Sequence, residues 1–172
     1  MLKKEIRILG LAAIDLRHGR RLIGVIFRGN LWLDGVLTIS FDTHTDYISE
    51  IAQAILKSRQ YSQVRAAILH ENLLPKGIQD LRKLILKTHL PTILVIKPKS
   101  HSHLTTTKSQ HARSLRIRRG RRKVILQTLE LDKEVAREIF LIGCRDNSLI
   151  PEALRIAELV AVALKKGQVT RI

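Results

Sequence analysis

Cysteine, aromatic residues and long apolar runs are all scarce in this chain. The single cysteine, Cys144, excludes an intramolecular disulfide, as is typical of a reducing compartment. We interpret Cys144 as a small buried residue in an apolar helix rather than as a nucleophile. Aromatic residues make up 3% of the sequence, so the core must rest on Leu, Ile, Val and Ala. No apolar run is long enough to span a bilayer, and Arg7 interrupts the first one. We therefore expect a cytoplasmic protein with no membrane partner and no signal peptide.

Acidic residues are also few. The chain has 31 Lys and Arg against 15 Asp and Glu, which gives a net charge of +16. Such an excess attracts polyanions, so nucleic acid, DNA or RNA alike, is the predicted partner. The length of 172 residues and a hydrophobic content of 45% predict one globular domain over residues 1–172.

Hydrophobic periodicity and turn signals predict an α/β fold. Three β-branched runs come first, with Gly29-Asn30 as a hairpin signal and Gly35 as a bulge signal. Downstream, strands alternate with amphipathic helices, which implies parallel pairing. Asp132 is expected to cap one helix and Gly167 to end the last. The expected strands cover residues 6–13, 22–28, 31–42, 64–69, 91–96 and 124–129, and the expected helices cover residues 46–56, 77–88, 133–144 and 151–166.

Residues 97–123 interrupt this pattern with ten Lys or Arg, three His and no acid. A field of one sign suits phosphate contacts with little choice of sequence. One alternative is a solvated, flexible loop. A basic helix over residues 109–119, ended by Gly120, is a further option on binding. The predicted nucleic-acid-binding residues are Arg113, Arg116, Arg118, Arg119, Arg121, Arg122 and Lys123.

Other patterns carry less chemistry. The chain has no Gly-rich phosphate-binding motif and no Gly-x-Ser-x-Gly elbow. His101, His103 and His111 lack a nearby Cys or acid in sequence, so we predict no metal site there. Trp32, the only tryptophan, is interpreted as a packing residue, with stacking on a base as the alternative.

Four stretches resemble one known family. They are Arg7-Ile8-Leu9-Gly10, the run Arg-Gly-Asn-Leu-Trp-Leu-Asp-Gly-Val at 28–36, Lys-Ser-Arg-Gln-Tyr at 57–61, and Ile-Pro-Glu-Ala-Leu-Arg-Ile-Ala at 150–157. Over nearly its whole length the chain resembles an uncharacterised archaeal family (domain of unknown function ninety-nine) related to endonuclease V. The resemblance implies a ribonuclease H-like fold, in which a mixed sheet of three antiparallel strands is continued by parallel strands and flanked by helices.

The residues that would carry metal chemistry in such a family are altered here. Ribonuclease H-like nucleases hold a divalent metal with carboxylates near the ends of central strands. The family's Asp-Asp pair after the first strand matches Ala12 and Ala13, whose methyl groups bind no metal. The family's Asp-Gly after the central strand matches His70 and Glu71, and His is a poor ligand for Mg²⁺. We therefore expect no cofactor and no standard metal-dependent nuclease activity.

Three functions remain open at this level. The first is a nucleic-acid-binding protein on an endonuclease V-like fold. The second is an active Mg- or Mn-dependent endonuclease, a hydrolase, with relocated ligands at Asp15, Asp34 and Glu71. Asp34 has a plainer interpretation as a turn residue that bonds its own backbone. The third is a non-enzymatic scaffold, with a homo-oligomer through the apolar C-terminal helices.

Overall fold

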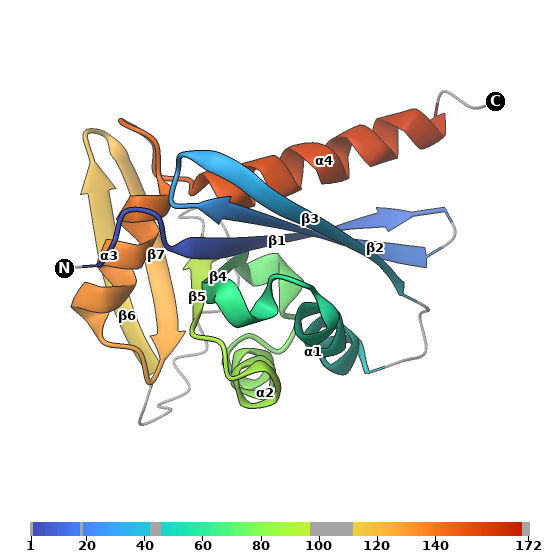
Figure 1. Cartoon of the computed structure of the whole chain (residues 1–172), viewed down its shortest axis with the longest axis horizontal. Coiled ribbons are helices and arrows are strands. Elements are labelled where there is room, and N and C mark those ends of the chain that lie inside the picture. The colour runs from blue at the N-terminus through green and yellow to red at the C-terminus, as the bar shows by residue number, and fades with distance from the viewer. Residues whose placement is uncertain (1, 18, 42–45, 97–111, 170–172) are drawn as a thin grey trace.

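A computed structural model describes residues 2–17, 19–41, 46–96 and 112–169, and these form one seven-stranded mixed sheet with four α-helices (Figure 1). Across the sheet the strands follow the order β3-β2-β1-β4-β5-β7-β6. The strands are β1 (Arg7–Leu16), β2 (Gly19–Arg28), β3 (Trp32–Phe41), β4 (Val64–His70), β5 (Thr92–Ile96), β6 (Ala112–Arg119) and β7 (Arg122–Leu129). The helices are α1 (Tyr47–Lys57), α2 (Ile78–Thr88), α3 (Lys133–Gly143) and α4 (Glu152–Val169), with short 3₁₀ turns η1 (Tyr61–Gln63) and η2 (Glu71–Leu73).

The first three strands form the predicted antiparallel meander. β1 and β2 pair from Arg7–Arg28 to Leu16–Gly19, so both strands run further than the hydrophobic pattern predicted. The residues at 16–21 were expected to be a polar turn, but most of them extend the ladder. Between β2 and β3 the register shifts so that Ile26 faces Gly35 and Phe27 faces Leu33. The bulge that Gly35 was taken to mark is therefore confirmed, with Asp34 beside it as the extra residue.

The second half of the sheet is only partly parallel. β4 pairs in parallel with β1 and with β5, as expected from the alternation of strands and helices. β7 runs antiparallel to β5, and β6 pairs antiparallel with β7. β6 was missed from the sequence, because its apolar residues are outnumbered by arginine. Residues 112–119, for which a basic helix on binding is one option, form this strand in the protein without a partner.

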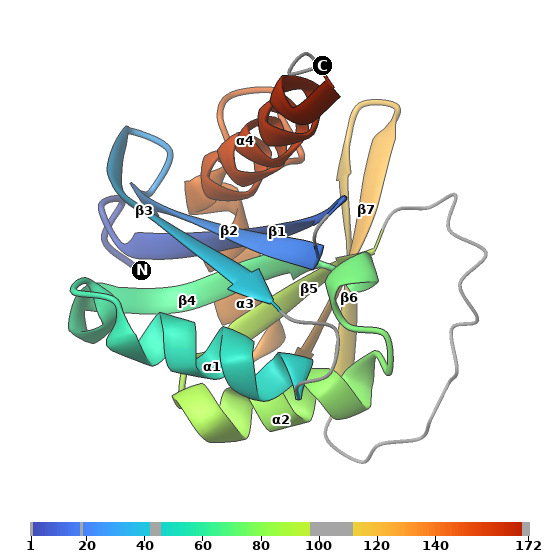
Figure 2. The ribbon, with the colours of Figure 1, turned by 90° about the vertical axis from the view of Figure 1, so that its right-hand side faces the viewer.

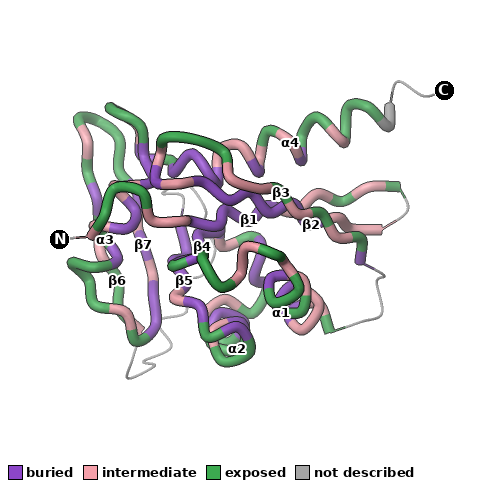
Figure 3. Tube along the Cα trace, viewed as in Figure 1, coloured by how far each residue is buried: buried purple, intermediate pink, exposed green. Residues whose placement is uncertain are grey.

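Helices cover both faces of the sheet, and each face has its own core (Figure 2). α1 and α2 pack on one face, where odd-numbered β1 residues such as Leu9 and Leu11 are buried. α3 and α4 pack on the other face, where Ile8 and Ala12 are buried. In Figure 3 the buried trace follows the central strands and the inward sides of the helices. Leu, Ile, Val and Ala make up most of both cores, as the scarcity of aromatic residues required, together with Phe27, Phe41 and Phe140.

The ends of the helices agree in part with those predicted from the sequence. Asp132 caps α3, and its carboxylate accepts from the backbone N–H of Glu134 and Val135, as predicted. These backbone hydrogen bonds hold the pKa of Asp132 below its ordinary value. Cys144 is buried, but it lies just beyond the end of α3 rather than within it. Gly167 was expected to end α4, but the helix continues to Val169.

Candidate functional site

The predicted nucleic-acid-binding residues lie on one β-hairpin, formed by β6, β7 and the turn at Gly120. Gly120 has a φ of +58°, a conformation that glycine adopts without strain. The paired residues run from Ala112–Leu129 at the base to Arg119–Arg122 beside the turn. The hairpin rises beside α4 at the edge of the sheet (Figure 2). Residues 97–111, including His101, His103 and His111, lie outside the described part of the chain.

Strand alternation divides the basic residues between two faces of the hairpin. Ile117 and Val124 oppose each other and are buried in the core beneath α3 and α4. Arg113 and Arg119 share this inward side of β6. The Arg113 guanidinium donates to the Leu131 carbonyl and lies 3.4 Å from an Asp132 carboxylate oxygen. Arg119 donates to backbone carbonyls at residues 145 and 148, at 3.2 and 3.1 Å. These two arginines therefore fasten the hairpin to the loops around α3.

Arg116, Arg118 and Lys123 lie on the opposite face of the same hairpin. Arg118 pairs with Lys123, and Arg116 pairs with Ile125, so three cations share one surface within two ladder rungs of each other. All three are exposed, and within the described part of the chain they form no ion pair. Figure 3 shows the hairpin tip as exposed trace. We call the surface formed by Arg116, Arg118 and Lys123 the open hairpin face. Arg121 and Arg122 are exposed at the hairpin tip beside it, and Arg122, which pairs with Arg119, belongs to the inward side.

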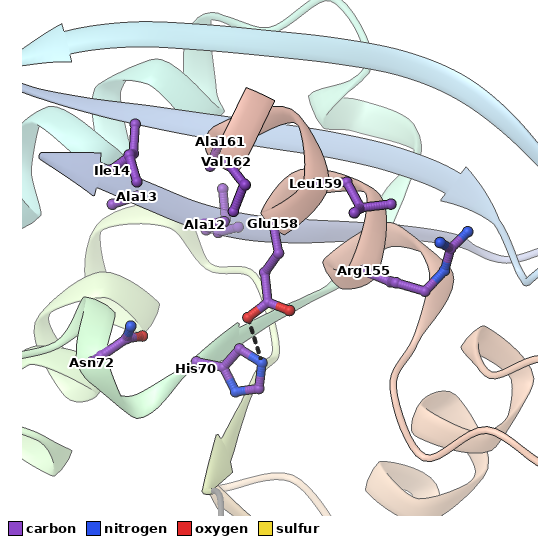
Figure 4. Close-up of a pocket in the computed structure, with 11 residues that line it drawn as sticks. Ala12, Ala13, Ile14, His70, Asn72, Arg155, Glu158, Leu159, Ala161 and Val162 are labelled. Carbon is purple, nitrogen blue, oxygen red and sulfur yellow. Dashed lines mark ion pairs between the residues drawn. The ribbon is translucent and has the colours of Figure 1, made fainter. Parts of the chain in front are cut away.

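A pocket of about 420 Å³ lies between α4 and the carboxyl ends of β1 and β4 (Figure 4). Its walls are mostly aliphatic, and its polar groups include His70 at the end of β4 and Glu158 on α4. Ala12 projects toward α4 beside them because even-numbered residues of β1 face that helix. Its lining residues are Leu11, Ala12, Ala13, Ile14, His70, Asn72, Arg155, Glu158, Leu159, Ala161 and Val162.

His70 and Glu158 are in direct contact across this pocket. His70 Nε2 lies 3.0 Å from Glu158 Oε1, but the angle is poor for a hydrogen bond. On its other side, His70 Nδ1 lies 3.3 Å from the Val95 carbonyl oxygen. The Val95 carbonyl and the Glu158 carboxylate are both hydrogen-bond acceptors. No sequence pattern singled out Glu158, although it is the only acid that follows Glu152 in the chain.

The residues of this pocket do not fit the magnesium centre that a ribonuclease H-like nuclease fold implies. Mg²⁺ prefers several oxygen ligands, from carboxylates, phosphates and water. Here two methyl groups, Ala12 and Ala13, and an imidazole stand beside a single carboxylate. Across the described residues, no group of three or more His, Cys, Asp or Glu side chains is placed to hold a metal ion. The side chains that line this pocket therefore do not supply the ligands of a magnesium site.

The three carboxylates named as relocated ligands are not brought together. Asp34 is a residue of β3 and lies beside the amino end of β1. The Arg7 guanidinium donates to its carboxylate, and Arg28 Nη2 lies 3.0 Å from Asp34 Oδ1. The pKa of Asp34 lies below its ordinary value, chiefly because of the hydrogen bond from Arg7 and also because of the contacts with Arg28. Asp15 lies at the far end of β1 and forms an exposed pair with Arg20 at 3.3 Å. Glu71 follows β4 in η2 and does not line the pocket.

Glu152 fixes the start of α4. Its side chain is 2% exposed and takes a bidentate pair of hydrogen bonds from Arg155, at 2.8 and 2.7 Å. Arg145, in the loop before α4, lies 3.1 Å from the same carboxylate. The hydrogen bonds from Arg155 are the main reason that the pKa of Glu152 lies below its ordinary value. The Ile-Pro-Glu segment therefore has a structural role here, at the base of the helix that carries Glu158.

Two further residues singled out in the sequence have clear positions. Cys144 is buried, and burial raises the pKa of its thiol to about 12, so it is a poor nucleophile at neutral pH. Trp32 opens β3 and its side chain is half exposed rather than packed in the core. No described helix is long and apolar enough to cross a membrane.

Solved structures with a similar fold include nucleases. A protein of unknown function from Archaeoglobus fulgidus has a TM-score of 0.69 at 19% identity, over 92% of this chain and 97% of that one. Endonuclease V from Streptomyces avermitilis has a TM-score of 0.66 at 19% identity, over 94% of this chain and 82% of that one. Argonaute from Marinitoga piezophila has a TM-score of 0.57 at 10% identity, over 93% of this chain and 30% of that one. The ribonuclease H-like fold implied by the sequence resemblance is therefore confirmed.

Relatives in sequence are archaeal, and no family model matches the chain. The UPF0215 protein of Methanothermobacter thermautotrophicus is 31% identical over 188 residues, which cover 97% of this chain and 91% of that protein. The UPF0215 protein of Thermococcus gammatolerans is 31% identical over 198 residues, which cover 98% of this chain and 97% of that protein. The fold is similar to that of endonuclease V, and identity of 31% over nearly full length establishes that the chain belongs to the archaeal UPF0215 family.

Proposed function

We propose that this protein binds nucleic acid through the open hairpin face, by phosphate contacts that need no divalent metal. One observation carries the proposal. Strand alternation places Arg116, Arg118 and Lys123 on one side of a hairpin whose other side is fastened to the core. Cations held on a ladder at strand spacing present a fixed row of donors to a phosphate backbone.

The division of roles between the two hairpin faces supports this function. Arg113 and Arg119 have carbonyl partners, so their charge serves the fold in part. Arg116, Arg118 and Lys123 have no acidic partner within residues 112–169, and holding three like charges together costs stability. A polyanionic partner would remove that cost. The overall charge of +16 would add long-range attraction of the same partner.

The pocket on α4 supports a binding rather than a cleaving protein. Its single carboxylate, Glu158, contacts His70, and Ala12 occupies the position facing them on β1. The Argonaute of similar fold was solved with guide RNA and target DNA, so this fold can serve strand binding. Endonuclease V of similar fold is named as a nuclease, and the aliphatic pocket of this chain argues against transfer of that activity.

Fluorescence-anisotropy binding to labelled single- and double-stranded DNA and RNA tests the proposal. Titrations run from roughly 50 to 300 mM salt, with EDTA and separately with Mg²⁺. We expect binding that is unchanged by EDTA and that weakens steeply with salt. The test variant carries Arg116→Ser, Arg118→Ser and Lys123→Ser. Removal of three phosphate contacts should lower the salt slope by about 2.7 on duplex DNA. Circular dichroism melts check that the variant is folded.

A matched control separates the hairpin from total charge. Lys3, Lys4 and Arg59 are exposed cations at the amino ends of β1 and β4, opposite the hairpin tip. Changing these three to Ser lowers the net charge by the same amount, and we expect a nearly unchanged salt slope. Equal losses in the two triple variants would contradict a specific role for the hairpin. Weak binding of the wild type at physiological salt would reject the function altogether.

A further inference from the structure

The outer edge of β3 is a long strand edge with unusual side chains. β3 pairs with β2 on one side, and no described strand pairs with its other side. Four large apolar residues near its start are about half exposed: Leu31, Trp32, Leu33 and Val36. Ten large apolar residues are exposed in the described chain, and these four fall within six positions. Such clustering marks an interaction surface, since scattered exposed apolar residues are the norm.

The charge distribution favours a second copy of this chain as the partner. Residues 29–41 contain no Lys, Arg or Pro, and their only charge, Asp34, is paired with Arg7 and Arg28. In a chain of net charge +16, this is a surface on which two copies can meet with little local repulsion. The opposite sheet edge, β6, carries four arginines, which oppose pairing with a second copy. Natural edge strands usually carry Lys or Pro against such pairing, and β3 has neither.

We propose that two copies of this chain associate through β3, edge to edge in antiparallel fashion, to form a two-fold symmetric dimer with a continuous fourteen-stranded sheet. The bulge at Gly35 leaves the strand from Val36 to Phe41 regular for this ladder. Val36, Thr38 and Ser40 are exposed, whereas Leu37 and Ile39 pack toward α1. Pairing with the same strand of a second copy closes after two chains, as isologous contacts do. The exposed apolar residues at the start of β3 would then flank this ladder, next to the partner. Figure 3 shows the trace of β3 by burial.

Analytical ultracentrifugation of the full chain tests the dimer. Sedimentation is measured from roughly 1 to 100 µM protein, at low and at high salt. We expect a species of twice the 19.6 kDa chain mass. Higher salt should strengthen it, because two chains of charge +16 repel less when screened. Trp32, the only tryptophan, should shift its emission to shorter wavelength as the dimer forms. Nucleic-acid binding weakens with salt, so the two properties respond in opposite directions and can fail independently.

A double variant, Val36→Lys with Thr38→Lys, addresses the edge directly. Both side chains are exposed, so the monomer should keep its fold, and like charges brought together should weaken the dimer at least about tenfold. The control, Gln79→Lys with Leu86→Lys, adds the same charge on exposed positions of α2 and should leave the dimer intact. A wild type that stays monomeric at the highest concentration in high salt overturns the proposal, as does a dimer that persists in the β3 variant.

Discussion

Gly10→Ala should lower the free energy of unfolding by about 3 kcal/mol, because it forces two backbones apart. Gly10 lies on the side of β1 that faces α4. A methyl group there would stand 2.2 Å from the Ala153 carbonyl carbon and 2.3 Å from the Leu154 backbone nitrogen. Both obstacles are main chain, so no side-chain rotation relieves them. Urea unfolding followed by circular dichroism measures the loss.

A glycine-to-alanine substitution should have the opposite effect at a position of α4 that contacts no other part of the protein. A methyl group at Gly167 meets nothing within 4 Å, and alanine is the better helix former. Gly167→Ala should therefore gain about 0.5 kcal/mol. An equal loss at both positions would show that close contact with β1 is not the cause. Because α4 carries Glu158, Gly10→Ala should also separate that carboxylate from His70.

Glu152→Gln should destabilise the protein by about 2 kcal/mol at pH 7, because a neutral amide replaces a buried carboxylate that is paired with two guanidinium groups. Glu152 is 2% exposed and receives two hydrogen bonds from Arg155 and an ion pair from Arg145. The amide can no longer accept through both atoms, and one of its N–H groups would face a guanidinium. Arg155 can turn partly to solvent, which limits the loss.

The pH dependence gives Glu152→Gln a second signature. The pKa of Glu152 is lowered in the folded protein from an ordinary value of 4.5, chiefly by the Arg155 hydrogen bonds. Its contribution is therefore fully present above about pH 4.5 and is lost as the pH falls through the folded-state pKa. The wild type and the variant should converge in stability over this range, as measured by urea unfolding at several pH values. Parallel curves would mean that the carboxylate charge contributes nothing. Glu134→Gln, at an exposed position on α3, is the control.

Local patterns predicted most elements because those elements are built from local physics. The Asp132 cap, the hairpin at Gly29-Asn30 and the bulge at Gly35 each depend on a few neighbouring residues. β6 was not predicted because its four arginines outnumber the two apolar residues on its inward side, Leu115 and Ile117. Its identity depends on pairing with β7 and on the core beneath it.

The sequence by itself determined the charge, the α/β class, the family resemblance and the loss of carboxylates at Ala12 and Ala13, because these follow from composition and short motifs. The tertiary structure decided which arginines are open to a partner. Strand alternation places Arg113 and Arg119 on the inward side of the hairpin, where they donate to backbone carbonyls that are distant in sequence. The tertiary structure also decided that His70 meets Glu158, 88 positions later in the chain. That contact requires Gly10 to admit α4 against β1, and long-range packing of this kind leaves no local signal in the sequence.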